Sequence, residues 1–479
     1  MLYAADVFLT AQVRSKKRRG AGSIGRSIVT KLAAVQRRAA LAITGGMRSS
    51  PGDTLDVLAN LLPFPVLLQQ HRLQAALRLA SLPSSHPLSK VVARSATRFV
   101  KRYPTQLHFL MEELKQHHIK IKHVEKLKAV RWRSTWDPEL KLEIASSKEE
   151  AADADAADGA RLQVYSDGSG LDGRIGAAAV LFRDGKQKNE ARYYLGSAKK
   201  HTVYEGESVG AVLALGLIAS CRKVRAVTLC IDSQATIKAT KSQQSVPGHY
   251  IMDGFHAALT ALCLKHRRMQ LTIRWVPGHI NVEGNEAADY AARLASTGDE
   301  TPRSTLPAFL QASLPHSKAA ARQCYRLRLK KRGARIWKKS IRHERTSRLL
   351  PSTSSARLSR KLATLPRKHT SLITQIITGH IPLAHHLSRI GSEESAICPC
   401  CHEQDETIAH YFLHCPVHSA PRAQMFARIP RQSQNLTHML STPPLRRCLL
   451  TFISRTGRFR SVFGTLPILA DPVPTDNNH

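Results

Sequence analysis

The sequence predicts an α/β domain in the middle of the chain, built on a five-stranded mixed sheet with flanking helices. Residues 160–298 carry three strand-like runs, followed by alternating helical and strand-like runs. Lys and Arg exceed Asp and Glu by 72 to 35, and much of this excess lies in the flanking regions. Four cysteines gather between positions 398 and 415. We therefore expect a basic helical region before the sheet and a small zinc-binding helical module after it.

The central elements follow from the spacing of apolar residues. Three strands in a meander are expected first, then an apolar helix, a strand, two helices, a strand and a last helix. In order, these elements cover 162–166, 173–182, 191–196, 204–219, 226–231, 233–241, 250–267, 270–276 and 284–296.

The flanking regions divide by composition. The acidic, small-residue-rich stretch 146–159 has no apolar period, so we interpret it as a flexible linker. The other predicted regions are a basic helical region at 1–145, a basic helical or linker segment at 299–365, the zinc module at 366–430 and a partly disordered tail at 431–479.

The net charge of +37 favours a polyanionic partner, most commonly nucleic acid. A basic protein without such a partner is the alternative. No apolar run approaches the roughly 20 residues of a membrane span, and the first residues do not resemble a secretory signal. The clustering of cysteines suggests a metal site in a reducing compartment rather than disulfides. We expect an intracellular protein, with the nucleus as one option and no membrane partner.

Four acidic residues of the central domain stand at positions suited to metal binding. Asp167 and Asp232 end predicted strands, Glu207 lies near the start of the apolar helix, and Asp289 lies in the last helix. Carboxylates at neighbouring strand ends can hold two Mg²⁺ ions about 4 Å apart over a phosphodiester. Taken alone, Asp167 or Asp232 has a structural alternative, in which it is a turn residue or a helix N-cap. As a set, the four indicate a metal-dependent nuclease.

Residues 162–297 resemble a type 1 ribonuclease H domain. The motifs that carry the resemblance occur in the order of that family: Tyr165-Ser166-Asp167-Gly168-Ser169, then 207–215, then Ile231-Asp232-Ser233-Gln234, then Trp275 to His279 followed by 284–289.

The resemblance implies roles for individual residues. Asp167, Glu207, Asp232 and Asp289 would hold two Mg²⁺ ions, with Mn²⁺ as an alternative, and His279 would shuttle protons or assist product release. The implied reaction is cleavage of the RNA strand of an RNA–DNA hybrid. Four further residues would contact substrate or support the site: Ser169, Thr202, Gln234 and Asn285.

Glu205 competes with Glu207 for the second carboxylate position. Residues two apart do not share a helix face, and the family pattern selects Glu207. We interpret Glu205 as a solvated residue at the helix start, favoured by the helix dipole. The basic helical handle of some family members is not evident near Gly248 and His249, so the basic flanks would supply hybrid affinity.

The spacing Cys398-x2-Cys401-x8-His410-x4-Cys415 offers three thiolates and an imidazole for structural Zn²⁺. Cys400 is an alternative to either neighbouring cysteine, and His402 and His414 compete with His410. Reduced cysteines in a helical core are the other interpretation.

A second resemblance concerns the flanks. Residues 372–416, which include Cys-x2-Cys, His410 and Cys415, resemble the C-terminal end of LINE-type retrotransposon polyproteins of the fungal sort. Segments 2–6, 35–39 and 42–45 resemble the end of the reverse transcriptase region in such elements. No Tyr-x-Asp-Asp motif occurs, so we expect the C-terminal part of an element rather than a polymerase.

Three functions are therefore considered. The first is a ribonuclease acting on RNA–DNA hybrids. The alternative is a catalytically inert, nucleic-acid-binding remnant of a retroelement. A zinc-stabilised protein-interaction module is a weaker third reading, and a steep fall of affinity with salt would argue against it.

Overall fold

The computed structural model describes residues 22–98, 105–128, 140–242, 244–278, 282–349, 359–360 and 362–466. These residues form two compact units. We call residues 70–328 the sheet unit, and 22–69 together with 329–466 the terminal unit.

The sheet unit contains a six-stranded mixed sheet, as expected from the sequence but with one strand more. Its order is β1-β6-β5-β2-β3-β4. Strands β2, β3 and β4 form the antiparallel meander, while β1, β6, β5 and β2 run parallel. The strands are β1 (Lys141–Glu143), β2 (Leu162–Leu171), β3 (Arg174–Arg183), β4 (Lys186–Ser197), β5 (Ala226–Ile231) and β6 (Gln270–Trp275).

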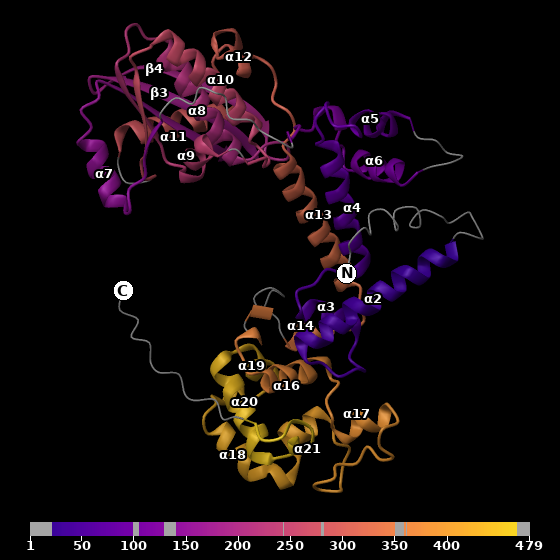
Figure 1. Ribbon diagram of the computed structural model, residues 1–479. Helices are drawn as coiled ribbons and strands as arrows, with labels where there is room; N and C mark the ends of the chain where they lie inside the picture. The colour runs from indigo at the N-terminus through magenta and orange to yellow at the C-terminus, as the bar shows by residue number, and fades with distance from the viewer. Residues whose placement is uncertain are drawn as a thin grey trace. The chain divides into compact units, whose positions relative to one another are not determined.

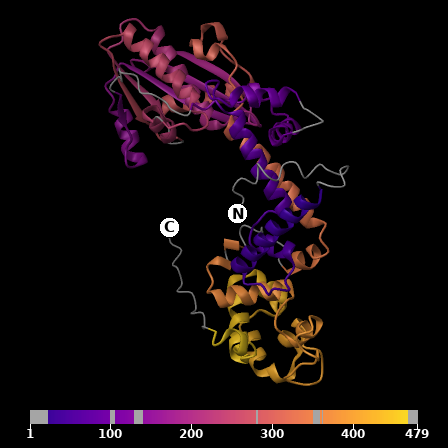
Figure 2. The ribbon, with the colours of Figure 1, turned by 45° about the vertical axis from the view of Figure 1, so that its right-hand side comes forward.

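Helices cover both faces of this sheet (Figures 1 and 2). On one face lie α8 (Val203–Ser220), α9 (Gln234–Lys241) and α10 (Tyr250–Lys265), and on the other lies α11 (Glu283–Thr297). The alternation of side chains along β3 explains the two layers, since successive residues of a strand point to opposite faces. Ile175, Ala177, Ala179 and Leu181 join the α8 core, while Ala178, Val180 and Phe182 join the α11 core.

Helix α8 approaches β2 closely at a glycine. A Cβ added to Gly168 would collide with the backbone nitrogen of Glu207, and one added to Gly210 would lie 3.0 Å from the carbonyl oxygen of Asp167. These two glycines therefore let the helix lie almost directly on the strand. The contact brings the start of α8 to the position of Asp167.

The acidic stretch 146–159 is not a flexible linker, contrary to the prediction. It contains α7 (Lys148–Ala156), whose N-cap Ser147 accepts a hydrogen bond from the backbone of Glu150. Tyr165 donates to Asp155 at 3.1 Å. Arg274 pairs with Asp158 at 3.0 Å.

Strand β1 was also missed, since it falls within a region predicted to be helical. It pairs in parallel with β6, and its Glu143 accepts a hydrogen bond from Arg274 at 2.8 Å. Arg274, which holds both β1 and the acidic stretch, lies more than a hundred residues further along the chain. The local spacing of apolar residues cannot predict contacts with a residue so far away in the sequence.

Further helices of the chain lie outside the sheet. They are α4 (Phe64–Ala80), α5 (Ser89–Thr97), α6 (Gln106–Gln116), η2 (Ile121–His123), η3 (Arg303–Thr305), α12 (Ala308–Gln311) and α13 (Lys318–Lys338). The predicted basic helical stretches before and after the sheet thus contain helices within the described residues.

The terminal unit is helical and has its own apolar core. Its helices are α2 (Gly22–Thr44), α3 (Gly52–Leu58), α14 (His343–Leu349), α16 (Arg367–Thr378), α17 (Ala384–Arg389), η4 (His410–His414), η5 (Pro416–His418), α18 (Ser419–Phe426), η6 (Arg431–Ser433), α19 (Leu436–Ser441), α20 (Pro443–Thr456) and α21 (Arg460–Phe463). Residues predicted as tail join this core, among them Leu449, Phe452 and Phe459. This part of the predicted tail, 436–463, is thus helical in large part, and 467–479 lie outside the described residues.

Among the described residues, one helix has the length and apolar composition of a membrane span. This helix is α8, and 67% of its apolar window is buried inside the protein. Its residues form the centre of the sheet unit's core, against β2 and β3.

Replacing Gly168 by Ala is expected to destabilise the sheet unit by about 1–3 kcal/mol, because the added methyl group overpacks the α8–β2 contact. Thermal unfolding would show this as a lower melting temperature. Gly159→Ala is the control, since a Cβ there meets nothing within 4 Å. Equal melting temperatures for the two variants would contradict the close approach.

Candidate active site and zinc site

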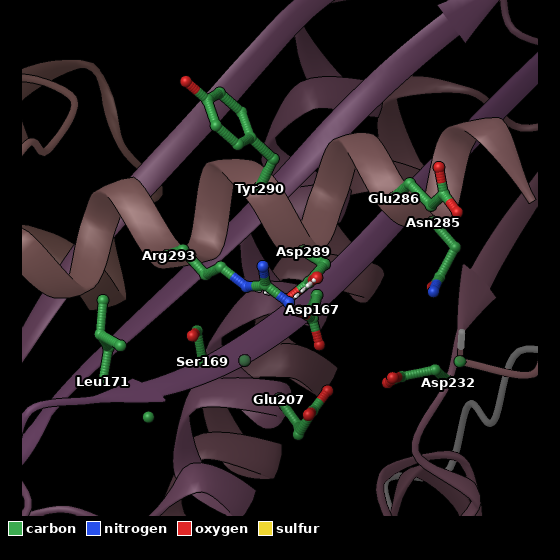
Figure 3. Close-up of a pocket in the computed structure, with 13 residues that line it drawn as sticks. Asp167, Ser169, Leu171, Glu207, Asp232, Asn285, Glu286, Asp289, Tyr290 and Arg293 are labelled. Carbon is green, nitrogen blue, oxygen red and sulfur yellow. Dashed lines mark hydrogen bonds and ion pairs between the residues drawn. The ribbon is translucent and has the colours of Figure 1, made fainter. Parts of the chain in front are cut away.

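The register of the sheet places two of the acidic residues side by side. Ser166 of β2 is paired with Ile231 of β5 in a parallel ladder, so the next residues, Asp167 and Asp232, stand at the same edge. Helix α8 brings Glu207 to this edge from one face, and α11 brings Asp289 from the other (Figure 3).

Three of the four carboxylates form a tight group. One oxygen each of Asp167, Glu207 and Asp232 lies within 4.8 Å of the others. Asp289 is near this group but is held by Arg293, with 2.6 Å between Oδ2 and Nη2 and 3.1 Å between Oδ1 and Nε (Figure 3). The structure thus brings together all four predicted residues at one cleft, with the fourth already in an ion pair.

Burial and mutual repulsion raise the pKa values of this group. The pKa of Asp167 is raised to about 7 by burial first, then by the charges of Asp232 and Asp289. The pKa of Glu207 is raised to about 10 by burial, then by Asp232 and Asp167. Without a cation, Asp167 and Glu207 hold protons near neutral pH because they are buried and because neighbouring carboxylate charges lie close to them.

The donor set fits a hard divalent cation. All donors are carboxylate oxygens, the ligands that Mg²⁺ and Mn²⁺ prefer. Glu207 Oε2 is buried and has no hydrogen-bond partner. Since an unsatisfied buried carboxylate oxygen is costly, a cation at this point would stabilise the site. Asp167, Glu207 and Asp232 are the residues that would hold it.

The carboxylates open into a cleft of about 750 Å³. Its lining includes two of the predicted substrate residues, Ser169 and Asn285. Asn285 is 4% exposed, and its Oδ1 has no hydrogen-bond partner. Gln234 is the first residue of α9 and is not part of the lining.

Thr202 and Glu205 cap α8 instead of facing the cleft. The Thr202 hydroxyl accepts from the Glu205 backbone at 3.3 Å, and the Glu205 carboxylate accepts from the Thr202 backbone at 2.8 Å. Glu205 is fully buried, so its interpretation as a solvated residue is wrong. The Thr-x-x-Glu spacing is a capping-box signal that the sequence already carried.

His279 lies outside the described residues, and Gly278 before it lines the cleft. Three lining residues of α11 were missed by the sequence reasoning: Glu286, Tyr290 and Arg293. The sequence could have predicted Arg293 as a cleft residue, because a residue four positions after Asp289 lies on the same face of the helix.

The four predicted zinc ligands also come together. One donor atom each of Cys398, Cys401, His410 and Cys415 lies within 4.8 Å of the others. The Sγ atoms of Cys398 and Cys415 are 4.0 Å apart, and Cys401 Sγ is 3.4 Å from His410 Nε2. This set of three sulfurs and one nitrogen fits a closed tetrahedral Zn²⁺ site.

The competing residues stand outside this group. Cys400, His402 and His414 do not belong to the ligand cluster found among the described residues. Gln404 Oε1 lies 3.3 Å from His410 Nδ1, the ring nitrogen that faces away from the thiols. Such a contact orients a ligand histidine.

Comparison with known families gives two matches. Residues 159–297 match the RNase H family, and residues 353–420 match the family described as zinc-binding in reverse transcriptase. The first match contains strands β2 to β6, and the second contains the Cys–Cys–His–Cys cluster. The comparison with curated proteins gave no match.

Several solved structures are similar to a part of this chain. RNase H1 from Halobacterium salinarum is 21% identical over 29% of this chain and 98% of its own, with a TM-score of 0.24. The RNase H domain of rv2228c from Mycobacterium tuberculosis is 17% identical over 29% and 95%, with a TM-score of 0.24. The foamy viral protease-reverse transcriptase is 16% identical over 29% and 96%, with a TM-score of 0.24.

Glu207→Gln is expected to stabilise the protein in the absence of divalent ions. Because the folded-state pKa of Glu207 is raised to about 10, the wild type loses stability as pH rises from the unfolded-state value toward that pKa. The gain in melting temperature should therefore grow between about pH 5 and about pH 9. Mg²⁺ should raise the melting temperature of the wild type and not that of the variant.

The control for this prediction is Glu283→Gln, which removes an exposed carboxylate of α11 outside the carboxylate group. It should respond to pH and Mg²⁺ as the wild type does. A Glu207→Gln variant that is less stable than the wild type at high pH would contradict the repulsion inferred for the site.

Cys398→Ser and Cys415→Ser should each abolish binding of the single zinc ion, measured by atomic absorption on purified protein. The terminal unit should also lose stability, because structural zinc contributes folding free energy directly. Cys400→Ser is the matched control, since Cys400 neighbours the cluster without belonging to it. Zinc loss in Cys400→Ser with retention in Cys398→Ser would refute the ligand set.

Proposed function

We propose that the sheet unit is an endoribonuclease that hydrolyses the RNA strand of an RNA–DNA hybrid with the help of two divalent metal ions. The observation that carries this proposal is the group formed by the buried Asp167 and Glu207 and the half-buried Asp232, which line an open cleft. The RNase H match of residues 159–297 supports the reaction class.

The geometry of the carboxylates supports a role in binding divalent cations. Bound divalent cations would activate water and neutralise charge on the phosphodiester. Asp167, Glu207 and Asp232 would hold the cations, and Asp289 lies beside them in the ion pair with Arg293. His279, which lies outside the described residues, would move protons.

The substrate is proposed from chemistry and from the relatives. Ser169 and Asn285 offer a hydroxyl and an amide to the cleft, groups that can contact a 2′-hydroxyl. A solved RNase H1 that matches this chain is a complex with an RNA/DNA hybrid. The basic flanking regions would add phosphate contacts. The zinc-binding match at 353–420, which follows the RNase H match along the chain, supports the proposal that the chain comes from a LINE-type retroelement.

A catalytically inert nucleic-acid-binding protein is the second candidate. The observation that favours it is the bidentate ion pair between Arg293 and Asp289, which occupies the fourth carboxylate. If this pair persists with substrate bound, the site retains three carboxylates for the cations.

Purified full-length protein incubated with an end-labelled RNA–DNA hybrid and Mg²⁺ should cut only the RNA strand. Asp167→Asn should slow cutting by at least about a hundredfold, since metal ions contribute several kcal/mol to stabilising the transition state. Asp172→Asn is the matched control: Asp172 is exposed in the β2–β3 turn at φ 48°, a conformation that Asn tolerates.

Tight binding of the hybrid without cutting, in Mg²⁺ and in Mn²⁺, would favour the inert candidate. Equal cutting by Asp167→Asn and the wild type would place the activity elsewhere in the preparation.

A further inference from the structure

A second cleft, of about 680 Å³, lies in the terminal unit. Residues of α14, the turn after α16, α17, η4 and α19 line it. We call it the arginine cleft after two of its residues, Arg345 and Arg389. It does not share residues with the carboxylate site or with the proposed zinc ligands.

Positive charge accumulates at this cleft, and the one acidic residue that lines it among the described residues, Glu406, is already paired with Arg458. The sequence has no Asp or Glu between Glu344 and Glu393, a stretch that includes α14, α16 and α17. Among the described residues, no ion pair or hydrogen bond is formed by the side chain of Arg345 or of Arg389. The guanidinium of Arg345 packs against Gly379, at the end of α16, so closely that a Cβ there would collide with it.

The acidic residues nearest to the cleft are already paired. Both carboxylate oxygens of Glu406 are used, by Arg458 at 2.6 and 2.7 Å and by the backbone of Ala384 at 2.6 Å. Glu344 pairs with Arg348 at 2.6 Å, and Asp405 lies 3.3 Å from His385. Glu406 and Glu344 are therefore already paired with other arginines.

The histidines behind the cleft are neutral at physiological pH. The pKa of His380 is lowered to about 4 by burial first, then by the neighbouring charges of His386, Arg389, Arg345 and Arg342. His380 and His386 share the hydroxyl of Ser49, at 3.1 and 3.0 Å. Arg345 and Arg389 thus line the cleft together with the neutral His386, and burial and then the charge of Arg389 lower the pKa of Arg345. Like charges held in this way are stabilised when an anion binds between them.

Part of the remaining lining of the cleft is apolar. Leu349, Ile408, Leu413 and Leu436 line it and are only partly buried against the core of the terminal unit. A ligand for this cleft therefore combines an anionic group with a flat or apolar one. The volume is in the range of pockets for ligands of nucleotide size.

We propose that the arginine cleft binds one nucleotide of single-stranded nucleic acid, with its phosphate at Arg345 and Arg389 and its base on the leucine- and isoleucine-lined wall. Arginine suits this role because its planar guanidinium binds phosphate in a bidentate manner. A single strand is favoured over a duplex, since only an unpaired base can leave its stack to enter a pocket. The inference does not depend on nuclease activity of the sheet unit.

The test measures binding of a fluorescein-labelled single-stranded oligouridine to the full-length chain, in an Asp167→Asn background without Mg²⁺. Arg345→Gln/Arg389→Gln should weaken binding at least about tenfold, because each arginine makes a charge-assisted hydrogen bond to phosphate. The slope of log affinity against log salt should become shallower by about 1.4, that is by about 0.7 for each arginine that no longer neutralises a phosphate.

The matched control is Arg428→Gln/Arg431→Gln, which removes the same charge from exposed positions of the same unit outside the cleft. This control should change affinity less than about twofold, as expected for removing exposed charge away from the bound strand. Equal weakening by the two double variants would show that net charge alone binds nucleic acid, and the proposal would fail. It would also fail if binding of a blunt duplex weakened as much as binding of the single strand.

A structural role for the two arginines predicts a different result. If Arg345 only stabilises the end of α16, its replacement should lower the melting temperature of the terminal unit, whereas relief of repulsion should leave it unchanged or raise it. Should the double variant unfold, cross-linking of a 5-iodouridine oligonucleotide to the unsubstituted chain decides the question. Adducts in 343–349 or 408–413 support the cleft, and adducts confined to other segments refute it.

Discussion

Three carboxylates crowd together where β2, β5 and α8 meet, and much of the sheet unit is arranged to make that contact. The parallel pairing of β2 with β5 aligns Asp167 with Asp232. Gly168 and Gly210 then permit α8 to lie on β2, which brings Glu207 within 4.8 Å of both. Burial first, and then repulsion among these carboxylates, raises the pKa values of Asp167 and Glu207, as expected for a site that we propose is completed by cations.

The terminal unit has its own group of polar residues next to its apolar core. Its Cys–Cys–His–Cys cluster sits beside an apolar core that Tyr411, Phe452 and Phe459 help to form. Glu406, fully buried, ties this region to Arg458 through two short hydrogen bonds. Glu406 also lines the arginine cleft, and because Arg458 already pairs with it, Arg345 and Arg389 keep their positive charge there. The same ion pair thus stabilises the unit and leaves a surface suited to phosphate.

The sequence predicted site residues best where they lie within a local sequence pattern, such as the end of a strand or a regular cysteine spacing. Strand ends and apolar periods predicted Asp167, Asp232 and the elements around them, and cysteine spacing predicted the zinc cluster. The errors arose where tertiary contacts decide the structure: α7 and β1 are ordered by Tyr165 and Arg274. Glu205 was misread because its burial depends on packing around α8, although its capping-box spacing was visible.

The central claim is that the buried carboxylates are a divalent-cation site. Anomalous diffraction from crystals of the full-length protein grown with Mn²⁺ tests it most directly. The account predicts Mn²⁺ peaks within bonding distance of Asp167, Glu207 and Asp232, absent in Glu207→Gln. The claim would be contradicted if these carboxylates were well ordered but showed no Mn²⁺ peak, at Mn²⁺ concentrations that support cleavage by other ribonucleases. Protons shared between the carboxylates would then be what stabilises the group.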